Sequence, residues 1–349
     1  MFGERLKRAR AALGLSMKKL AEQSGVSANM IKKYEHGESM PSSGILINLA
    51  KALDVSSSYF FKQEQVRIPE FNYRKRSRTS QKVLNKIKSA VLDNVESWFE
   101  LKNIWPNFPI PTFIDIPTLS SQIDTMVQAE EAAERVREYW QLGNGPIADL
   151  IDVLENQGIL VITIGDDEID DFDGLQANLD QQPILVCKGY VDGARQRFTL
   201  AHELGHLLLG DRISENMDEE KVCHRFAGAL LVPAEKMKQY LGQSRRKLEV
   251  GELYLIKQEF GISMQACLFR ARDLQILSSH ACKSMFIEFG KRGWRKQEPG
   301  AAVAPEKTTQ FKRLVLRALG EGIIGESKAA ELLNTPLVVF HRERLMDNF

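Results

Sequence analysis

Cysteine is scarce in this sequence, and its placement narrows the kinds of protein that the chain can be. The 349 residues include four cysteines, which lie far apart and form no C-x-x-C pair. A disulfide framework and a cysteine-rich zinc site both need closer or repeated spacings, so neither is indicated. We expect reduced, mostly buried thiols at Cys187, Cys223, Cys267 and Cys282.

Long apolar runs are missing as well. No stretch approaches the roughly 18 consecutive apolar residues that a membrane span needs. The first residues, MFGERLKRAR, are charged where a signal peptide has its apolar core. We therefore expect a cytoplasmic protein with no membrane partner. The hydrophobic content of 43% is enough for packed cores, and the length predicts roughly two or three domains.

The chain also lacks a large net charge, because its formal net charge is +1. The charge is unevenly distributed, however, since residues 1–62 carry ten Lys or Arg against five Asp or Glu. A basic segment on a near-neutral chain favours an anionic partner for that segment.

The basic segment has the signals of five short helices. Ser16 and Ser27 are suited to cap helices, and Gly25 is suited to form the turn between them. Two short helices around such a turn, the second with polar residues at its start, form a helix-turn-helix. The stretch LAEQSGVSANMIKKYEHGESMPS resembles the Cro/C1-type (Xre) family, and the resemblance covers the whole of residues 1–62.

This resemblance implies that the second helix of the motif lies in the major groove of a double-stranded DNA operator. Ala28, Asn29 and Lys32 then fall where base edges are read. Asn29 is the preferred specificity residue, because an asparagine amide pairs with adenine through two hydrogen bonds. The alternative for the lysines of this segment is a solvated charged face. Phosphate contacts are expected from Lys18, Ser27 and Lys33.

Modules of this type generally read two-fold sites, so we expect a homodimer. The apolar positions of the same segment predict the core of the domain. The expected core residues are Leu20, Ala21, Val26, Ile31, Tyr34 and Leu49.

A second pattern lies in residues 197–211, RFTLAHELGHLLLGD, where two histidines and a glutamate form H-E-x-x-H. On a helix, His202 and His206 lie on one face and one turn apart, so both imidazoles can bind the same cation. Zinc binds histidine nitrogen and, in catalytic sites, keeps a position open for water. Glu203 flanks the cation without binding it, which suits a general base that takes a proton from this water.

The alternative is that these histidines are ordinary helix residues and that the match is accidental. The neighbouring side chains are apolar nearly all round the helix, so we expect the helix to be buried. Buried histidines and a buried glutamate need partners, and one metal ion provides a partner for all three.

A third ligand is expected from the next helix, residues 219–233, EEKVCHRFAGALLVP. Glu220 and His224 are four residues apart and face the same way, and Pro233 ends the helix. Together with the H-E-x-x-H helix, this segment closely resembles the ImmA/IrrE family of metallopeptidases. The resemblance aligns the ligand glutamate of that family with Glu220. A carboxylate beside two histidines is a common set for catalytic zinc, Zn2+, which is the cofactor we expect.

The sequence departs from the family pattern at two positions. His224 stands where the family usually has Asn, and Val232 stands where it usually has Met. His224 is therefore an alternative ligand in place of Glu220, or a group behind the ligands, and Glu219 is a further rival. For Glu220 the alternative role is that of a solvated residue favoured near the start of a helix.

The expected fold class is α+β and mostly helical. We expect an N-terminal all-α helix-turn-helix domain, a central zincin-like metallopeptidase domain with a small sheet, and a helical C-terminal region. The boundaries we expect are 1–62 for the DNA-binding domain, 63–120 for a linker and Pro-rich strap, 121–245 for the metallopeptidase domain and 246–349 for the C-terminal region.

Within these segments, local patterns predict particular elements. Two helices, at residues 122–140 and 146–157, precede two strands, GILVITIG and PILVCKG. Between the strands we expect DDEIDDFDG to be a solvated loop, because its spacing departs from a calcium-binding loop. We expect RKRSR, residues 74–78, to be a linker, and a DNA contact is the alternative. Residues 251–277 have the layout of a second helix-turn-helix; Arg270 and Arg272 could touch DNA, but a packing unit is favoured.

Two functions follow from these motifs. The first is a DNA-binding transcriptional regulator fused to a zinc metallopeptidase. The ImmA/IrrE resemblance implies a protein substrate, such as a repressor. The second is a non-hydrolytic autorepressor or antitoxin, whose peptidase-like domain senses or binds a partner such as a toxin.

Overall fold

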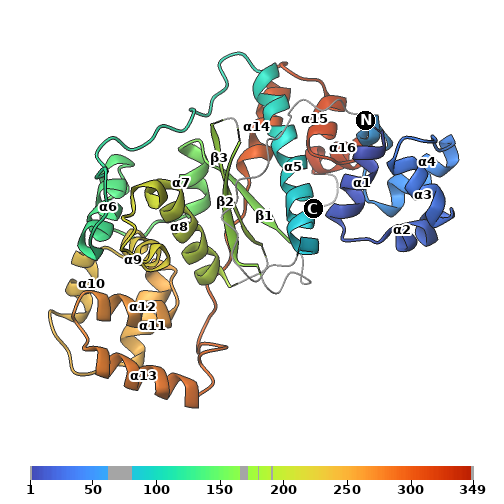
Figure 1. Ribbon diagram of the computed structural model, residues 1–349. Coiled ribbons are helices and arrows are strands. Elements are labelled where there is room, and N and C mark those ends of the chain that lie inside the picture. Colours follow the sequence, from blue (N-terminus) through green and yellow to red (C-terminus); the bar gives the residue numbers. More distant parts are fainter. Residues whose placement is uncertain (1, 62–80, 166–171, 180, 190–191, 347–349) are drawn as a thin grey trace. The chain divides into compact units, whose positions relative to one another are not determined.

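The computed structural model describes residues 2–61, 81–165, 172–179, 181–189 and 192–346 (Figure 1). The chain is mostly helical with one small three-stranded sheet, as the sequence predicted. It forms two compact units, each described by itself below: the first comprises described residues up to 61, 81–109 and from 309 onward, and the second residues 110–308. The expectations for RKRSR and for residues 166–171 of the acidic stretch fall outside the described residues. No helix in the described part of the chain is both long and apolar enough to cross a membrane.

The first unit begins with a helical domain whose caps are those that the sequence predicted. The Ser16 hydroxyl accepts from the Lys19 backbone N–H, and the Ser27 hydroxyl accepts from that of Met30. Gly25 adopts a positive φ of 73° between these helices. The elements are α1 (Phe2–Ala12), α2 (Met17–Ser24), α3 (Ala28–Glu35), α4 (Ser43–Ala52) and the 3-10 helix η1 (Ser57–Phe61).

The core of this domain holds α1 tightly against α3. A Cβ atom on Gly3 would lie 2.3 Å from the Glu35 carbonyl oxygen, so only glycine fits there without a shift. Arg10 of α1 donates to both carboxylate oxygens of Glu35, at 2.5 and 2.9 Å. Val26, which was also expected in the core, is partly buried and packs against it. The other expected core residues are buried: Leu20, Ala21, Ile31, Tyr34 and Leu49.

Four further helices complete the first unit. Arg5 and Arg8 of α1 each form an ion pair with Glu96 of the long helix α5 (Gln81–Ile104), at 2.5 and 2.7 Å. Lys328, near the C-terminal end of the sequence, pairs with Glu100 of the long helix inside this unit. The added helices are α5 (Gln81–Ile104), α14 (Gln310–Gly320), α15 (Glu326–Leu332) and α16 (Leu337–Leu345).

The second unit contains the sheet. Strand β3 is central: it pairs with β1 in parallel and with β2 in antiparallel, which gives the order β1-β3-β2. All six residues from Gln182 to Cys187 are buried, as expected for a central strand covered on both faces. The strands are β1 (Leu160–Ile164), β2 (Gly174–Leu179) and β3 (Gln182–Lys188).

Strand β2 was not predicted. Its sequence, GLQANL, starts with glycine and has polar residues at two alternating positions, Gln176 and Asn178. Such a short, half-polar run gives a weak strand signal, and pairing with β3 decides its conformation. The antiparallel register joins Gly174 to Cys187 and Leu179 to Gln182.

The helices of this unit carry the two segments that matter for function. Helix α8 packs against β2 and β3, and α9 packs along α8. The two helices preceding the sheet lie where the sequence predicted, although both are shorter. The helices of this unit are α6 (Met126–Tyr139), α7 (Leu150–Asn156), α8 (Gly193–Leu209), the 3-10 helix η2 (Gly210–Arg212), α9 (Glu219–Leu231), α10 (Ala234–Leu241), α11 (Val250–Phe260), α12 (Met264–Asp273) and α13 (Ser279–Lys291).

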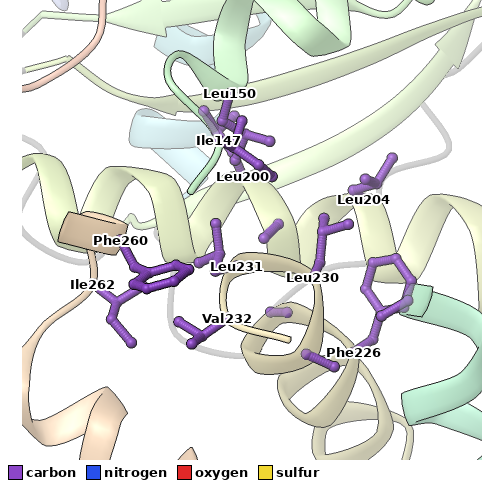
Figure 2. Packing of buried hydrophobic residues seen from close by; sticks show 14 of the residues in the cluster. Ile147, Leu150, Leu200, Leu204, Phe226, Leu230, Leu231, Val232, Phe260 and Ile262 are labelled. Atoms are coloured by element: carbon purple, nitrogen blue, oxygen red, sulfur yellow. The ribbon is translucent and has the colours of Figure 1, made fainter. Parts of the chain in front are cut away.

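The apolar core of the second unit fixes the spacing of α8 and α9. Leu200 and Leu204 of α8 face Phe226 and Leu230 of α9 in this core (Figure 2). At Gly205 an added Cβ would lie 3.3 Å from Cys223 Cα and 3.2 Å from the Phe226 ring. The glycine inside the H-E-x-G-H segment therefore lets the two helix backbones approach closely.

The second helix-turn-helix layout is present as α11 and α12. Gly261 has a positive φ of 65° at the turn, and Ser263 caps α12. Arg270 is 2% exposed, donates to the Val232 carbonyl oxygen at 2.9 Å and pairs with Glu130 of α6. Its guanidinium is thus used inside the fold and cannot contact DNA, in agreement with the packing role that was favoured.

Candidate metal centre and nucleic-acid interface

Helix α8 holds the H-E-x-x-H residues in a buried position. The Asp192 carboxylate caps its N-terminus by accepting from the Ala194 backbone N–H at 3.0 Å. His202, Glu203 and His206 are 2%, 4% and 8% exposed, because the rest of this helix is packed on the sheet and on α9. Imidazoles and a carboxylate placed so deeply need polar or ionic partners.

Helix α9 brings a carboxylate to the two imidazoles. The Nε2 atoms of His202 and His206 are 3.1 Å apart. Glu220 places Oε2 at 3.4 Å from His202 Nε2 and Oε1 at 3.4 Å from His206 Nε2. Ligands held about 2.0–2.1 Å from a tetrahedral zinc ion lie about 3.3–3.4 Å from one another. The spacing of these three donor groups therefore fits a zinc ion, although their assignment as ligands stays a prediction.

Glu219 lies behind His206. Its Oε1 is 2.7 Å from His206 Nδ1. A carboxylate accepts hydrogen bonds, so Nδ1 carries the proton and the lone pair of His206 is on Nε2, the atom that faces Glu220. Histidines that bind metals commonly have such a carboxylate on their other nitrogen. From the sequence, Glu219 was only an alternative ligand. The spacing of residues does not show whether a carboxylate binds the metal or accepts a hydrogen bond from a histidine that binds it.

His224 is also close to this group. One ligand atom from each of His202, Glu220 and His224 can be chosen so that all lie within 4.8 Å of one another. His224 Nδ1 lies 2.6 Å from the backbone carbonyl oxygen of Glu220. The two donor sets, one with His206 and one with His224, share His202 and Glu220.

Glu203 lies beside the first residue of β2. A Cβ atom on Gly174 would be 3.1 Å from Glu203 Oε1 and 2.6 Å from Thr199 Cγ2. The glycine at position 174 therefore allows the backbone of β2 to approach Glu203, the candidate general base, closely. Sequence analysis missed Gly174, since the only available signal was a glycine at the end of the acidic stretch.

The candidate DNA interface lies on α2 and α3. All six residues predicted to contact DNA are exposed, whereas the opposite faces of both helices are buried in the domain core. Ser27 uses its oxygen to cap α3, which leaves its hydroxyl proton free to be donated to a phosphate. The exposed residues are Lys18, Ser27, Ala28, Asn29, Lys32 and Lys33.

Comparison with known proteins identifies both regions. A helix-turn-helix family model matches residues 6–60, and the model of the IrrE N-terminal-like domain, Peptidase_M78, matches residues 154–272. The second match includes α8, α9 and the α11–α12 unit.

Relatives are found for the first region. An uncharacterized transcriptional regulator in the ATPase CF(0) region of Rhodospirillum rubrum is 44% identical over 59 residues, 17% of this chain and 55% of that protein. The SPbeta prophage-derived uncharacterized HTH-type transcriptional regulator YonR of Bacillus subtilis (strain 168) is 37% identical over 62 residues, 18% of this chain and 57% of that protein. The chain thus spans about half the length of the curated relatives it matches.

Among solved structures, the crystal structure of ComR from S. thermophilus in complex with DNA and its signalling peptide ComS is similar at 14% identity. The match covers 99% of this chain and 95% of that chain, with a TM-score of 0.18. The family matches are what identify the two regions. Residues 6–60 are a helix-turn-helix domain of the Cro/C1 type, and residues 154–272 are an IrrE N-terminal-like domain of the Peptidase_M78 family.

Proposed function

We propose that this protein is a DNA-binding transcriptional regulator whose IrrE-like domain is a zinc-dependent metallopeptidase that cleaves a protein, such as a repressor. The observation that carries the proposal is the convergence of three donor groups beside Glu203. His202 Nε2, His206 Nε2 and the Glu220 carboxylate lie 3.1–3.4 Å apart. A domain that matches a peptidase family supports the same chemistry.

Each side chain of the site has its own role in the proposed hydrolysis. His202, His206 and Glu220 would hold the metal, and Glu219 keeps the Nε2 lone pair of His206 directed at it. A bound zinc ion supplies Lewis acidity, which polarises a peptide carbonyl and makes water a stronger acid. Glu203 accepts the proton of the attacking water on its carboxylate and passes it to the leaving amine.

The sheet supports a polypeptide as the substrate. Among the described residues β2 pairs with β3 on one edge, and its other edge presents backbone N–H and C=O groups. An extended peptide can add to such an edge through main-chain hydrogen bonds. Because Gly174 starts β2 next to Glu203, a peptide bound along this edge would pass the general base.

The helix-turn-helix domain would place the protein on DNA. We propose that Ala28, Asn29 and Lys32 contact base edges, and that Lys18, Ser27 and Lys33 contact phosphates. A homodimer would match a two-fold operator. Binding near a DNA-bound repressor raises the local concentration of that substrate.

A substitution of Glu203 separates metal binding from hydrolysis. Full-length zinc-loaded protein is incubated with the proteins encoded next to it, and fragments are identified by mass spectrometry. The proposal expects fragments that a chelator abolishes, and none from the Glu203→Gln variant, which should still bind zinc. Chelator-insensitive fragments, or equal cleavage by Glu203→Gln, would refute the peptidase function.

A second candidate function is a non-hydrolytic autorepressor or antitoxin. The position of His224 favours it, because a fourth protein donor close to the other ligands is a feature of closed, structural zinc sites. Under this alternative the Glu203→Gln variant would still repress its operator and still neutralise its partner, for example a toxin. A small toxin gene beside this one would favour this function, and a separate repressor gene would favour the first.

A further inference from the structure

His224 is held next to the candidate ligands and, like Glu220, is exposed to solvent. Its ring centroid lies 4.4 Å from that of His202 and 5.7 Å from that of Phe198, so the ring is flanked by both. His202 and His206 are buried, whereas His224 is exposed. An exposed side chain can change its rotamer at little cost in packing, which the two buried histidines cannot do.

The hydrogen bond of His224 fixes which of its nitrogens is available. The Glu220 carbonyl oxygen only accepts, so the Nδ1 atom 2.6 Å away must carry the proton. In the neutral ring Nε2 then has a free lone pair. A lone pair suits a metal ligand, whereas stabilising an oxyanion would need an N–H group at this atom.

The distance to the other donors is short enough for binding. One ring nitrogen of His202, one of His224 and one carboxylate oxygen of Glu220 lie within 4.8 Å of one another. The ligands of a tetrahedral zinc ion lie about 3.3–3.4 Å apart, so this spacing is within about 1.5 Å of that of a zinc site. Rotation of the exposed His224 side chain would bring its Nε2 atom to this spacing.

We infer that His224 is a removable fourth ligand that closes the metal site. This inference rests on the proposed function, because it assumes zinc held by His202, His206 and Glu220. His224 Nε2 would occupy the position that catalytic zinc sites keep open for water. The domain would therefore rest in a closed form, and hydrolysis would begin only after a substrate or partner displaced the His224 ring.

The test counts imidazole ligands in full-length, zinc-loaded protein by X-ray absorption at the zinc edge. His224→Asn is the informative variant, since its amide N–H can still bond to the Glu220 carbonyl oxygen but the Nε2 ligand is gone. His280→Asn is the matched control, because His280 is also exposed and lies on α13. Zinc affinity is measured in parallel by competition with a chelating indicator.

The inference predicts three imidazoles in the wild-type protein and in His280→Asn, and two in His224→Asn. Zinc affinity of His224→Asn should fall at least about tenfold, since losing even an outer partner of a ligand costs about 10–100-fold. Two imidazoles in all three proteins, with equal affinities, would overturn the closing role and leave the proposed function intact. A zinc ion without histidine ligands in the wild-type protein would overturn both.

Discussion

Glu219 gives the sharpest prediction about the candidate metal centre. Its carboxylate accepts from His206 Nδ1 at 2.7 Å, which fixes the tautomer and the direction of the ring. Losing such a partner typically lowers metal affinity about 10–100-fold. The Glu219 side chain is 37% exposed, so water screens its charge and the lower end of this range applies. We therefore expect Glu219→Ala to bind zinc about tenfold more weakly, or about 1.4 kcal/mol.

The assay is zinc competition against a chelating indicator at constant pH, with full-length protein. Glu219→Gln should fall between wild type and Glu219→Ala, because its amide oxygen accepts the same hydrogen bond without a charge. Glu215→Ala is the control for a lost surface carboxylate nearby, and it should bind zinc like the wild type. An affinity of Glu219→Ala within about twofold of wild type would refute the positioning role. The melting temperatures of the metal-free proteins show whether any loss reflects a weakened start of α9.

Four further substitutions test the rest of the account. Gly205→Val forces side-chain atoms against Cys223 and Phe226, so thermal unfolding should show a loss of about 1–3 kcal/mol. Glu130→Gln leaves the buried Arg270 without its counter-charge and should cost about 3–5 kcal/mol in denaturant unfolding. Burial raises the pKa of Glu130, but Arg270 and Arg225 outweigh it and hold the pKa below its ordinary value of 4.5. This stabilisation should thus be present above pH 4.5 and be lost as the pH falls below it, unlike in Glu130→Gln. Asn29→Ala should cost about 1–3 kcal/mol at one base pair of the operator, whereas Lys33→Ala should weaken binding to all sequences and reduce its salt dependence. An equal effect of Asn29→Ala on all sequences would contradict its assignment as a base-reading residue.

The helix-turn-helix domain could be predicted almost completely from the sequence. Ser16, Gly25 and Ser27 act through their own backbone and side-chain geometry, so their effect is local and visible in the sequence. The same holds for Gly261 and Ser263 at the second helix-turn-helix layout. Helices whose ends are set by a capping side chain or a glycine turn were therefore predicted together with their boundaries, to within a few residues.

Features that depend on tertiary contacts could not be predicted in this way. Strand β2 forms because β3 offers it a partner, although Gln176 and Asn178 weaken its own pattern. A packing role was favoured for the segment that holds Arg270, but its ion-pair partner, Glu130, lies 140 residues away and could not be identified from the sequence. The supporting position of Glu219 and the approach of Gly174 to Glu203 likewise depend on how α9 and β2 pack against α8.

The account depends most on a zinc ion held by His202, His206 and Glu220, and the zinc content of purified protein tests this directly. Full-length wild-type protein and variants are loaded with zinc, dialysed extensively and analysed for metal by mass spectrometry. The account predicts about one zinc ion per chain in the wild type and in Glu203→Gln, and almost none in the combined His202→Ala, His206→Ala and Glu220→Ala variant. A folded combined variant that retains as much zinc as the wild type would contradict it.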